Sequence, residues 1–159
     1  MQNTDLAWLA GIWEGEGTIA IFSHQEKNGI TKICPCCSVV NTDLALINKV
    51  RKILQELGCN FTLKEYNEKN RKKKWVYRTQ NQRYIILFLE AILPYIYGNK
   101  KANAEIVLDY TKQRLAKIER LPSKGTTKYD ETDWSYLTKF RSSQTTREAP
   151  TGEDIVGLH

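Results

Sequence analysis

The sequence predicts an α+β protein built from helices and two antiparallel β-hairpins. Apolar residues recur at helical spacing in four segments, and two pairs of short, β-branched or aromatic segments are each joined by a turn. The order helix–strand–strand–helix–strand–strand–helix–helix lacks the crossover connections that parallel strands need. With 159 residues, 41% of them hydrophobic, the chain is long enough for one domain with its own core.

The first helix is predicted to run to about Glu16. Thr4 or Asp5 can cap its start, and Gly15 and Gly17 mark its end. Between them the apolar residues recur every three or four positions, which is typical of a helix with one buried face.

Two hairpins follow from the strand patterns. Residues 18–24 and 31–41 predict the first hairpin, and Pro35 indicates an edge strand or a bulge there. Residues 60–68 and 73–80 predict the second hairpin, with a lysine-rich turn between its strands.

Three further helices are predicted. The clearest covers residues 41–58, where Thr42 caps the start and Gly58 stops the helix. Residues 81–96 and 99–121 predict the other two. A unit of one helix and two strands thus occurs twice, which hints at an internal duplication.

The chain divides into a core of residues 1–119 and a C-terminal extension of residues 120–159. The extension is polar and is expected to be loose beyond Ser142. One short packed helix is predicted in it, formed around Trp134, Tyr136, Leu137 and Phe140.

The positive charge is concentrated in the front of the chain. The net charge is +6, and residues 1–119 hold 18 basic against 12 acidic residues. Residues 64–78 are the most basic segment, with seven basic and two acidic residues. Such a patch either binds a polyanion such as nucleic acid or is a solvated hairpin tip.

Several classes of protein are disfavoured by composition. No segment approaches the roughly 20 apolar residues of a membrane span, and the first residues lack the basic and apolar regions of a signal peptide. We therefore expect an intracellular protein, in the cytoplasm or an organelle, without a membrane partner. The four cysteines lack zinc-site spacing and are expected to be buried free thiols, with a disulfide as the alternative.

Residues 9–17, LAGIWEGEG, place glycines in the first helix, although each helical glycine costs about 1 kcal/mol relative to alanine. Ala7, Gly11 and Gly15 are four residues apart and share one face almost without side chains. Another backbone can approach this face closely, either a second helix or a strand of the same chain. If a second copy packs there, two Glu16 carboxylates meet, and a divalent cation relieves their repulsion.

A dimer interface and a metal site follow from this arrangement. The interface residues are Ala7, Trp8, Gly11, Ile12 and Gly15, and the metal-site residues are Glu16 and Gly15. Trp8 and Trp13 are expected to pack in the interface or the core rather than to stack on bases. The expected cation is Mg²⁺, which prefers one or two carboxylates together with water and phosphate oxygens.

LAGIWEGEG resembles the motif of the LAGLIDADG homing endonucleases, with conservative changes at most positions. The helix–strand order, the helix at 41–58 and the segment KKANAEIVL also resemble the family's pattern through about residue 118. The resemblance implies the αββαββα LAGLIDADG fold with a saddle-shaped antiparallel sheet over the DNA major groove, plus a C-terminal helical tail. One motif implies an intron-encoded homodimer that hydrolyses both strands of a long, near-palindromic DNA target with Mg²⁺. Mn²⁺ or Ca²⁺ could substitute for binding, and no small-molecule cofactor is implied.

The resemblance also suggests catalytic residues. Glu16 stands where the family has a metal-binding aspartate and is one methylene longer. Lys100 corresponds to a lysine close to the scissile phosphates, with Lys101 as the alternative, although either can simply solvate a helix start. Asn41 or Thr42 could position water, or both can cap the following helix.

Strand alternation predicts the residues that face DNA. Ile19, Ile21, Phe61 and Leu63 are expected to face the core, and Trp75 and Tyr77 to pack inward. The outward DNA-binding residues are then Phe22, His24, Thr62, Lys64, Tyr66, Lys74 and Arg78, joined by Lys32, by Lys101 and by Arg71, Lys72 and Lys73 at the turn. The second strand, with three cysteines and a proline, gives no polar alternation, so only Lys32 is assigned there.

The favoured function is a site-specific DNA endonuclease. The alternatives are an RNA maturase of the same fold, a DNA-binding regulator that does not cleave, and a small basic RNA-binding protein of the ribosomal kind. The last leaves the small-residue face and its terminal acids unexplained.

Overall fold

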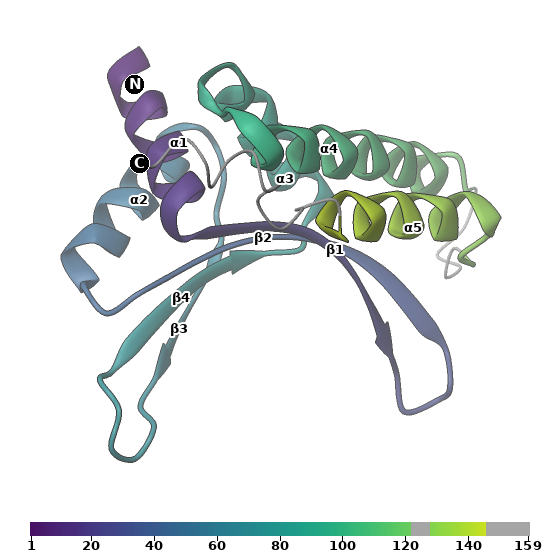
Figure 1. The fold of residues 1–159 in the computed structure, drawn as a ribbon, viewed down its shortest axis with the longest axis horizontal. Coiled ribbons are helices and arrows are strands. Elements are labelled where there is room, and N and C mark those ends of the chain that lie inside the picture. Colours follow the sequence, from purple (N-terminus) through teal and green to yellow (C-terminus); the bar gives the residue numbers. More distant parts are fainter. Residues whose placement is uncertain (122–127, 146–159) are drawn as a thin grey trace, which may run out of the picture.

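The computed structural model describes residues 1–121 and 128–145 and contains one four-stranded sheet with helices on one side of it (Figure 1). The elements are α1 (Asn3–Glu16), β1 (Gly17–Gln25), β2 (Thr31–Asn41), α2 (Leu44–Glu56), β3 (Thr62–Tyr66), β4 (Lys74–Thr79), α3 (Gln82–Ile92), the 3₁₀-helix η1 (Leu93–Tyr95), α4 (Gly98–Glu119) and α5 (Glu131–Thr145). The predicted element order is confirmed.

The sheet joins the two hairpins through their inner strands. Its order is β1-β2-β4-β3, and every neighbouring pair is antiparallel. β1 pairs along its whole length with residues 31–39 of β2, whereas β4 pairs only with the segment Cys37–Asn41 of β2. Pro35 therefore lies where β2 has no neighbour on its second side, so a missing backbone N–H is tolerated there. β2 is thus a central strand of the sheet, but the part of it that contains Pro35 has a neighbour on one side only, as an edge strand does.

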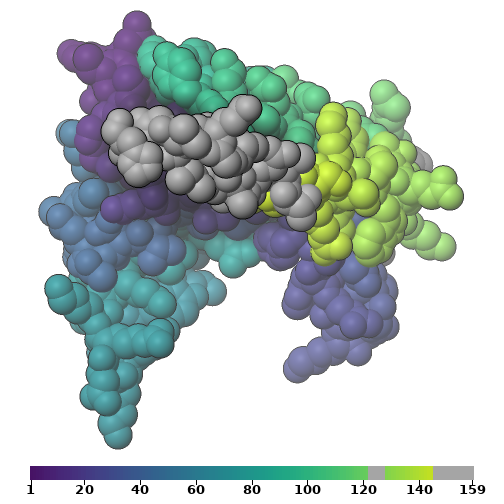
Figure 2. Space-filling view, viewed as in Figure 1, coloured from purple at the N-terminus to yellow at the C-terminus, as the bar shows by residue number. Residues whose placement is uncertain are grey.

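The two hairpins diverge from this junction. In Figure 1 they curve away from the helices as two arms, and Figure 2 shows an open hollow between the arms. The antiparallel saddle sheet predicted from the family resemblance is confirmed. We call the side of the sheet opposite the helices the concave face.

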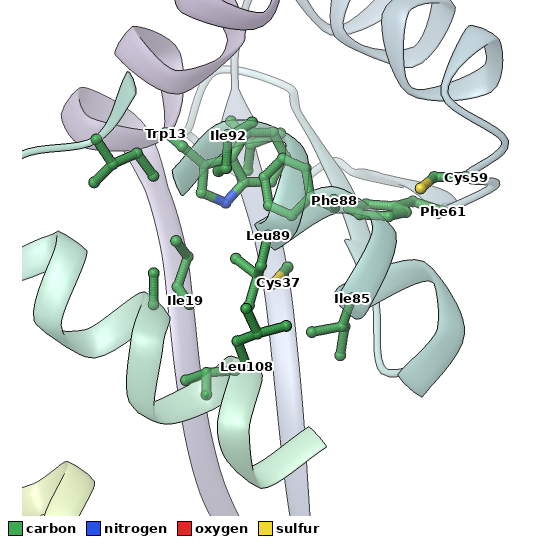
Figure 3. Packing of buried hydrophobic residues seen from close by; sticks show 14 of the residues in the cluster. Trp13, Ile19, Cys37, Cys59, Phe61, Ile85, Phe88, Leu89, Ile92 and Leu108 are labelled. Carbon is green, nitrogen blue, oxygen red and sulfur yellow. The ribbon is translucent and has the colours of Figure 1, made fainter. Parts of the chain in front are cut away.

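The core lies between the helices and the other side of the sheet (Figure 3). Trp13 of α1 is fully buried, with its rings 4.5 Å from Phe88 and 6.3 Å from Phe61 between centroids. Gly17 is required beside it, since a Cβ at this position would lie 2.7 Å from the Cα of Trp13. The predicted inward residues Ile19, Ile21, Phe61 and Tyr77 are buried, and Leu63 and Trp75 are half-buried.

The start of α2 corrects one sequence-based prediction. Thr42 is exposed, and Asp43 is the residue that caps the helix, accepting hydrogen bonds from the backbone N–H groups of Ala45 and Leu46. The side chain of Asn41 in turn accepts from the N–H of Asp43 at 2.7 Å. Three polar residues in a row all have capping chemistry, and the path of the chain selects the last one.

The predicted helix of the extension exists as α5 and packs on α4 and β1. Leu137 and Phe140 are buried in the main core, and Tyr136 is half-buried. Trp134 is 43% exposed, so its predicted packing is wrong. The expected loose end beyond Ser142 falls mostly on residues 146–159, which lie outside the described residues, and the division at residue 119 stays a prediction.

The composition led us to expect no membrane-spanning segment and buried free cysteines. None of the helices in the described ranges is long and apolar enough to cross a membrane. The cysteines are free thiols: Cys36, Cys37 and Cys59 are buried, and Cys34 is half-buried. Burial raises the pKa of the Cys59 thiol to about 11, so it is neutral at physiological pH.

An acid-sensitive contact holds α5 to α4. The ammonium of Lys117 donates to both carboxylate oxygens of Asp130, at 2.8 and 2.9 Å, and lowers the pKa of Asp130 from 3.8 to about 2. A depressed folded-state pKa means that the contact stabilises the fold above about pH 4 and is lost as pH falls toward 2. Asp130→Asn should therefore flatten the pH dependence of the free energy of unfolding between these values, as measured by urea denaturation. An unchanged slope would contradict this assignment.

Candidate functional site

The end of α1 brings together residues that are far apart in the sequence. Glu16 is exposed at the last position of the helix, and the amide nitrogen of Asn41, at the end of β2, donates to its carboxylate. Asn41 also accepts from the N–H of Asp43, so its amide is fixed at both ends. Two of the predicted catalytic residues, Glu16 and Asn41, are thus adjacent, while the exposed Thr42 lies beside them.

Lys100 reaches the same helix end from α4. Its ammonium donates to the carbonyl oxygens of Trp13 (2.6 Å), Glu14 (3.0 Å) and Gly17 (2.8 Å). These carbonyls belong to the last turn of α1 and the residue after it, where a cation is favoured by the helix dipole. Lys100 therefore fixes the backbone on both sides of Glu16. Lys101, the next residue of α4, is half-buried and contributes no hydrogen bond to this cap among the contacts described.

Glu14 makes the reciprocal contact. Its carboxylate accepts from the backbone N–H of Tyr97 at 2.7 Å, and Tyr97 is the N-cap residue of α4. The start of α4 is therefore capped by α1, and the end of α1 is capped by Lys100 of α4. We call this pair of contacts the α1–α4 clamp. The sequence analysis did not identify the contact between Glu14 and Tyr97.

The clamp should contribute measurably to stability. Lys100→Met removes the cation but keeps much of the apolar stem, and the expected loss is about 1–3 kcal/mol in the free energy of unfolding. Glu14→Gln keeps an oxygen acceptor for Tyr97, so it should cost less than Glu14→Ala, whose expected loss is about 0.5–2 kcal/mol. Urea denaturation of the three variants tests this ranking, and equal stability of Lys100→Met and the parent would refute the clamp.

The small-residue face of α1 is open in the described chain. Ala7, Gly11 and Gly15 are exposed, and a Cβ built at Gly11 or Gly15 meets no described atom within 4 Å. Unlike Gly17, these two glycines are not required by the packing of the described residues. The idea that this face packs against a strand of the same chain is therefore wrong for the described residues.

The neighbours of this face are the other predicted interface residues. Trp8 and Ile12 are half-buried against the core, and the ammonium of Lys49 in α2 lies 4.1 Å from the Trp8 ring centroid. Their apolar surface continues the open face, so the face is flanked by side chains that can complete an interface.

The strand register defines the concave face. Directly paired residues of antiparallel strands point to the same side of a sheet. The concave face consists of Thr18, Ala20, Phe22 and His24 on β1, Lys32, Cys34, Cys36, Ser38 and Val40 on β2, Lys74, Val76 and Arg78 on β4, and Thr62, Lys64 and Tyr66 on β3. All the strand residues predicted to face DNA lie here, although their contact with DNA stays a prediction.

Much of the predicted basic turn is ion-paired. Lys73 contacts Glu65 at 2.8 Å, and Glu68 contacts both Arg71 at 3.0 Å and Lys74 at 3.3 Å. These pairs are exposed, so each is worth little and is easily exchanged for another anion.

The far hairpin contains a similar pair. A hydrogen bond from Lys32 lowers the pKa of Glu26, and the same contact raises the pKa of Lys32. Lys32 therefore stays fully protonated at neutral pH, with its charge shared with Glu26.

A groove in the concave face was missed by the sequence analysis. It has a volume of about 510 Å³ and lies along β3 and β4 up to the start of α3. Besides the predicted Thr62, Lys64, Tyr66 and Arg78, its walls include Asn60, Val76, Thr79, Gln80, Asn81 and Tyr84. The two asparagines and Gln80 lie outside the strands, so strand alternation could not identify them.

The donor set around Glu16 fits a hard cation only in part. Within residues 1–121 and 128–145, no three His, Cys, Asp or Glu side chains gather as a metal site. Glu16 is one exposed carboxylate, and Mg²⁺ takes one or two carboxylates and completes its shell with water and phosphate oxygens.

Comparison with known proteins decides the family. The family model described as a LAGLIDADG-like domain matches residues 3–93, which extend from α1 through the end of α3. The chain belongs to this family. The match includes residues 9–17, the nonapeptide that resembles the family motif, and Glu16 is the last acid of this nonapeptide.

Solved LAGLIDADG structures share the fold. The homing endonuclease I-CvuI, in complex with a DNA target in the presence of Mg, has 20% identity and a TM-score of 0.53, with 88% of this chain and 98% of that chain covered. The archaeal intron-encoded homing endonuclease I-Vdi141I, complexed with DNA, has 16% identity and a TM-score of 0.58, with 91% and 99% covered. No curated protein matches the chain.

A longer LAGLIDADG protein is matched only in part. The meganuclease I-AabMI, bound to uncleaved DNA, has 16% identity and a TM-score of 0.61, with 99% of this chain but 50% of that chain covered. The LAGLIDADG chain described here thus has the length of one half of that protein.

Proposed function

We propose that this LAGLIDADG protein is a homing endonuclease that binds a long, near-palindromic DNA site as a homodimer and hydrolyses both strands with Mg²⁺. The observation that carries the proposal is the open Gly11 face of α1, which ends at the exposed carboxylate of Glu16. Two copies of α1 packed through this face place two Glu16 side chains side by side. The half-length match to I-AabMI supports the need for two copies.

The residues around Glu16 suit phosphodiester hydrolysis. The two Glu16 carboxylates would hold Mg²⁺, which would polarise a phosphate and lower the pKa of a bound water. In the reaction, water adds to phosphorus, one P–O ester bond breaks, and the departing sugar oxygen takes up a proton. Asn41 holds the Glu16 carboxylate, and the α1–α4 clamp holds the backbone beneath it.

Lys100 has a positioning role in this proposal. Three carbonyls accept from its ammonium, and these contacts fix the turn that carries Glu16. Its positive charge would offset part of the negative charge that develops on a phosphate held at Glu16. Lys101 remains the alternative contact to the DNA backbone.

The concave face suits duplex DNA. Its lysines and Arg78 point away from the helices, and the hollow between the hairpins is open in Figure 2. The ion pairs at the β3–β4 turn are exposed, so Arg71 and Lys73 can exchange glutamate for phosphate, and Lys72 lies between them in the same turn.

A cleavage assay tests the proposal. The purified chain is incubated with a plasmid library of randomised duplex sites, and with DNA spanning the uninterrupted insertion site of its own gene, in Mg²⁺ or in EDTA. The expected result is Mg²⁺-dependent linearisation of a subset of plasmids. Binding to duplex without cleavage would indicate a regulator, and a preference for structured RNA would indicate a maturase; either result would overturn the proposal.

A further inference from the structure

Arg78 lies across the centre of the concave face. It belongs to β4, where it pairs with Ser38 of β2 and Thr62 of β3. Its guanidinium nevertheless reaches β1, with Cζ 5.3 Å from the centroid of the Phe22 ring. On the way, Nε donates a hydrogen bond to Sγ of Cys36 at 3.1 Å. The side chain is therefore held at two points along its length.

Neither contact neutralises the arginine. Burial raises the pKa of the Cys36 thiol, so the acceptor is a neutral sulfur, and Phe22 presents the face of its ring. By contrast, Lys73 is paired with Glu65. Arg78 thus combines a fixed position with an uncompensated charge, and it is exposed.

The contacts of Arg78 leave one end of its guanidinium group accessible to a ligand. With Nε bound to Cys36, the two terminal Nη groups form the end that a ligand can approach. Arg78 also lines the groove described above, together with amide and hydroxyl side chains such as Asn60, Thr62 and Gln80. Donors and acceptors in this arrangement are suited to the edge of a base pair in the major groove.

We propose that Arg78 determines specificity by donating two hydrogen bonds to O6 and N7 of one guanine in each half of the DNA target, with Phe22 and Cys36 as positioning residues. This rests on the proposed function. Guanine is the base whose major-groove edge carries two adjacent acceptors that match the arginine fork. A contact to phosphate alone would carry no sequence information, whereas a guanidinium held in one place over the sheet is suited to reading one base.

Selection from a randomised duplex library tests the proposal. DNA bound by the parent, Arg78→Gln and Lys72→Ala proteins is sequenced. We expect the parent to prefer guanine over other bases by roughly ten- to a hundredfold at one base pair of each half-site. Arg78→Gln should shift that position toward adenine, whose edge matches a glutamine amide. Lys72→Ala, a charge removal at the turn, should weaken all sequences about equally.

The positioning residues have their own test in the same selection. Phe22→Leu and Cys36→Ala should reduce the guanine preference several-fold at that base pair while other positions keep theirs. Cys36→Ser restores an acceptor for Nε and should recover much of the preference. Equal loss of preference at all positions would show that Phe22 and Cys36 act only on stability.

Three results would overturn the assignment. If Arg78→Gln selects the parent's sequence at every position and only binds more weakly, Arg78 contacts phosphate. If Arg78→Gln does not fold, Arg78→Met, which keeps an apolar stem without any donor, decides by the same readout: an unchanged guanine preference contradicts the proposal. If the parent binds no duplex at all, the proposed function fails first and this assignment fails with it.

Discussion

The Glu16→Gln variant is expected to bind its DNA target and to leave both strands uncut. The substitution removes the negative charge that would hold Mg²⁺ but keeps an oxygen for Asn41, so the fold around it should survive. Loss of cleavage by at least about a hundredfold is expected, since changes even to residues behind a metal ligand cost roughly 10–100-fold. The measurements are the rate of plasmid linearisation in Mg²⁺ and the affinity for duplex in Ca²⁺.

A matched control separates the loss of the Glu16 charge from damage to the α1–α4 clamp. Glu14→Gln alters a carboxylate in the same helical turn, which accepts from Tyr97 and is not proposed to hold the cation. It should cleave with a far smaller loss than Glu16→Gln. Cleavage by Glu16→Gln at the parent's rate would refute Glu16 as the metal-binding residue.

Gly11→Leu is expected to abolish double-strand cleavage while leaving the single chain as stable as the parent or more so. A side chain at Gly11 meets open space in the described chain, and replacing a helical glycine gains up to about 1 kcal/mol. In the proposed dimer, the two α1 helices meet in a seam formed by their small-residue faces, and the leucine of each copy enters it. The expected cost to the free energy of association is about 2–6 kcal/mol. Association should then weaken by at least about tenfold, since each 1.4 kcal/mol is a factor of ten.

Gly17→Ala is the matched glycine substitution. Its added methyl would collide with Trp13 inside the same chain, so it should lower the free energy of unfolding of the isolated protein. The two substitutions are thus expected to have opposite effects on stability, as measured by urea denaturation. Full cleavage activity in Gly11→Leu would contradict the proposed seam.

The sequence predicted the element order well because the residues that end helices and form turns are clearly marked in it. Periodic apolar residues, Gly58 at the end of α2 and the polar turn of each hairpin leave few alternatives. The errors lie where two residues offer the same chemistry. Thr42 and Asp43 can both cap a helix, and only the chain path shows that Asp43 does. Trp134 was expected to pack as part of the short helix of the extension, but it is 43% exposed.

The face of β2 could not be predicted for a different reason. Cys34, Cys36 and Cys37 have similar polarity, so alternation carries no signal along this segment. The face is set by the register with β1, which places Cys36 on the concave face and Cys37 in the core.

The site was predictable in part. The motif identifies Glu16, and the end of β2 suggests Asn41, but the clamp joins residues more than 80 positions apart. A single sequence gives no signal for such a pairing, because every residue has a backbone carbonyl and the sequence does not show which of them a lysine contacts. The ion pair between Glu68 and Arg71 is different, because its i,i+3 spacing within the basic segment could have been used to predict it.

Disulfide formation across the seam tests the central claim most directly. Ala7→Cys and Gly11→Cys each place a thiol on the open face of α1, and the proteins are oxidised while bound to DNA. Packing of two α1 helices predicts a covalent dimer of two 18.4 kDa chains on a non-reducing gel for at least one variant, and no dimer for the parent. If both variants cut DNA and remain single 18.4 kDa chains after oxidation, two copies of α1 do not meet through this face.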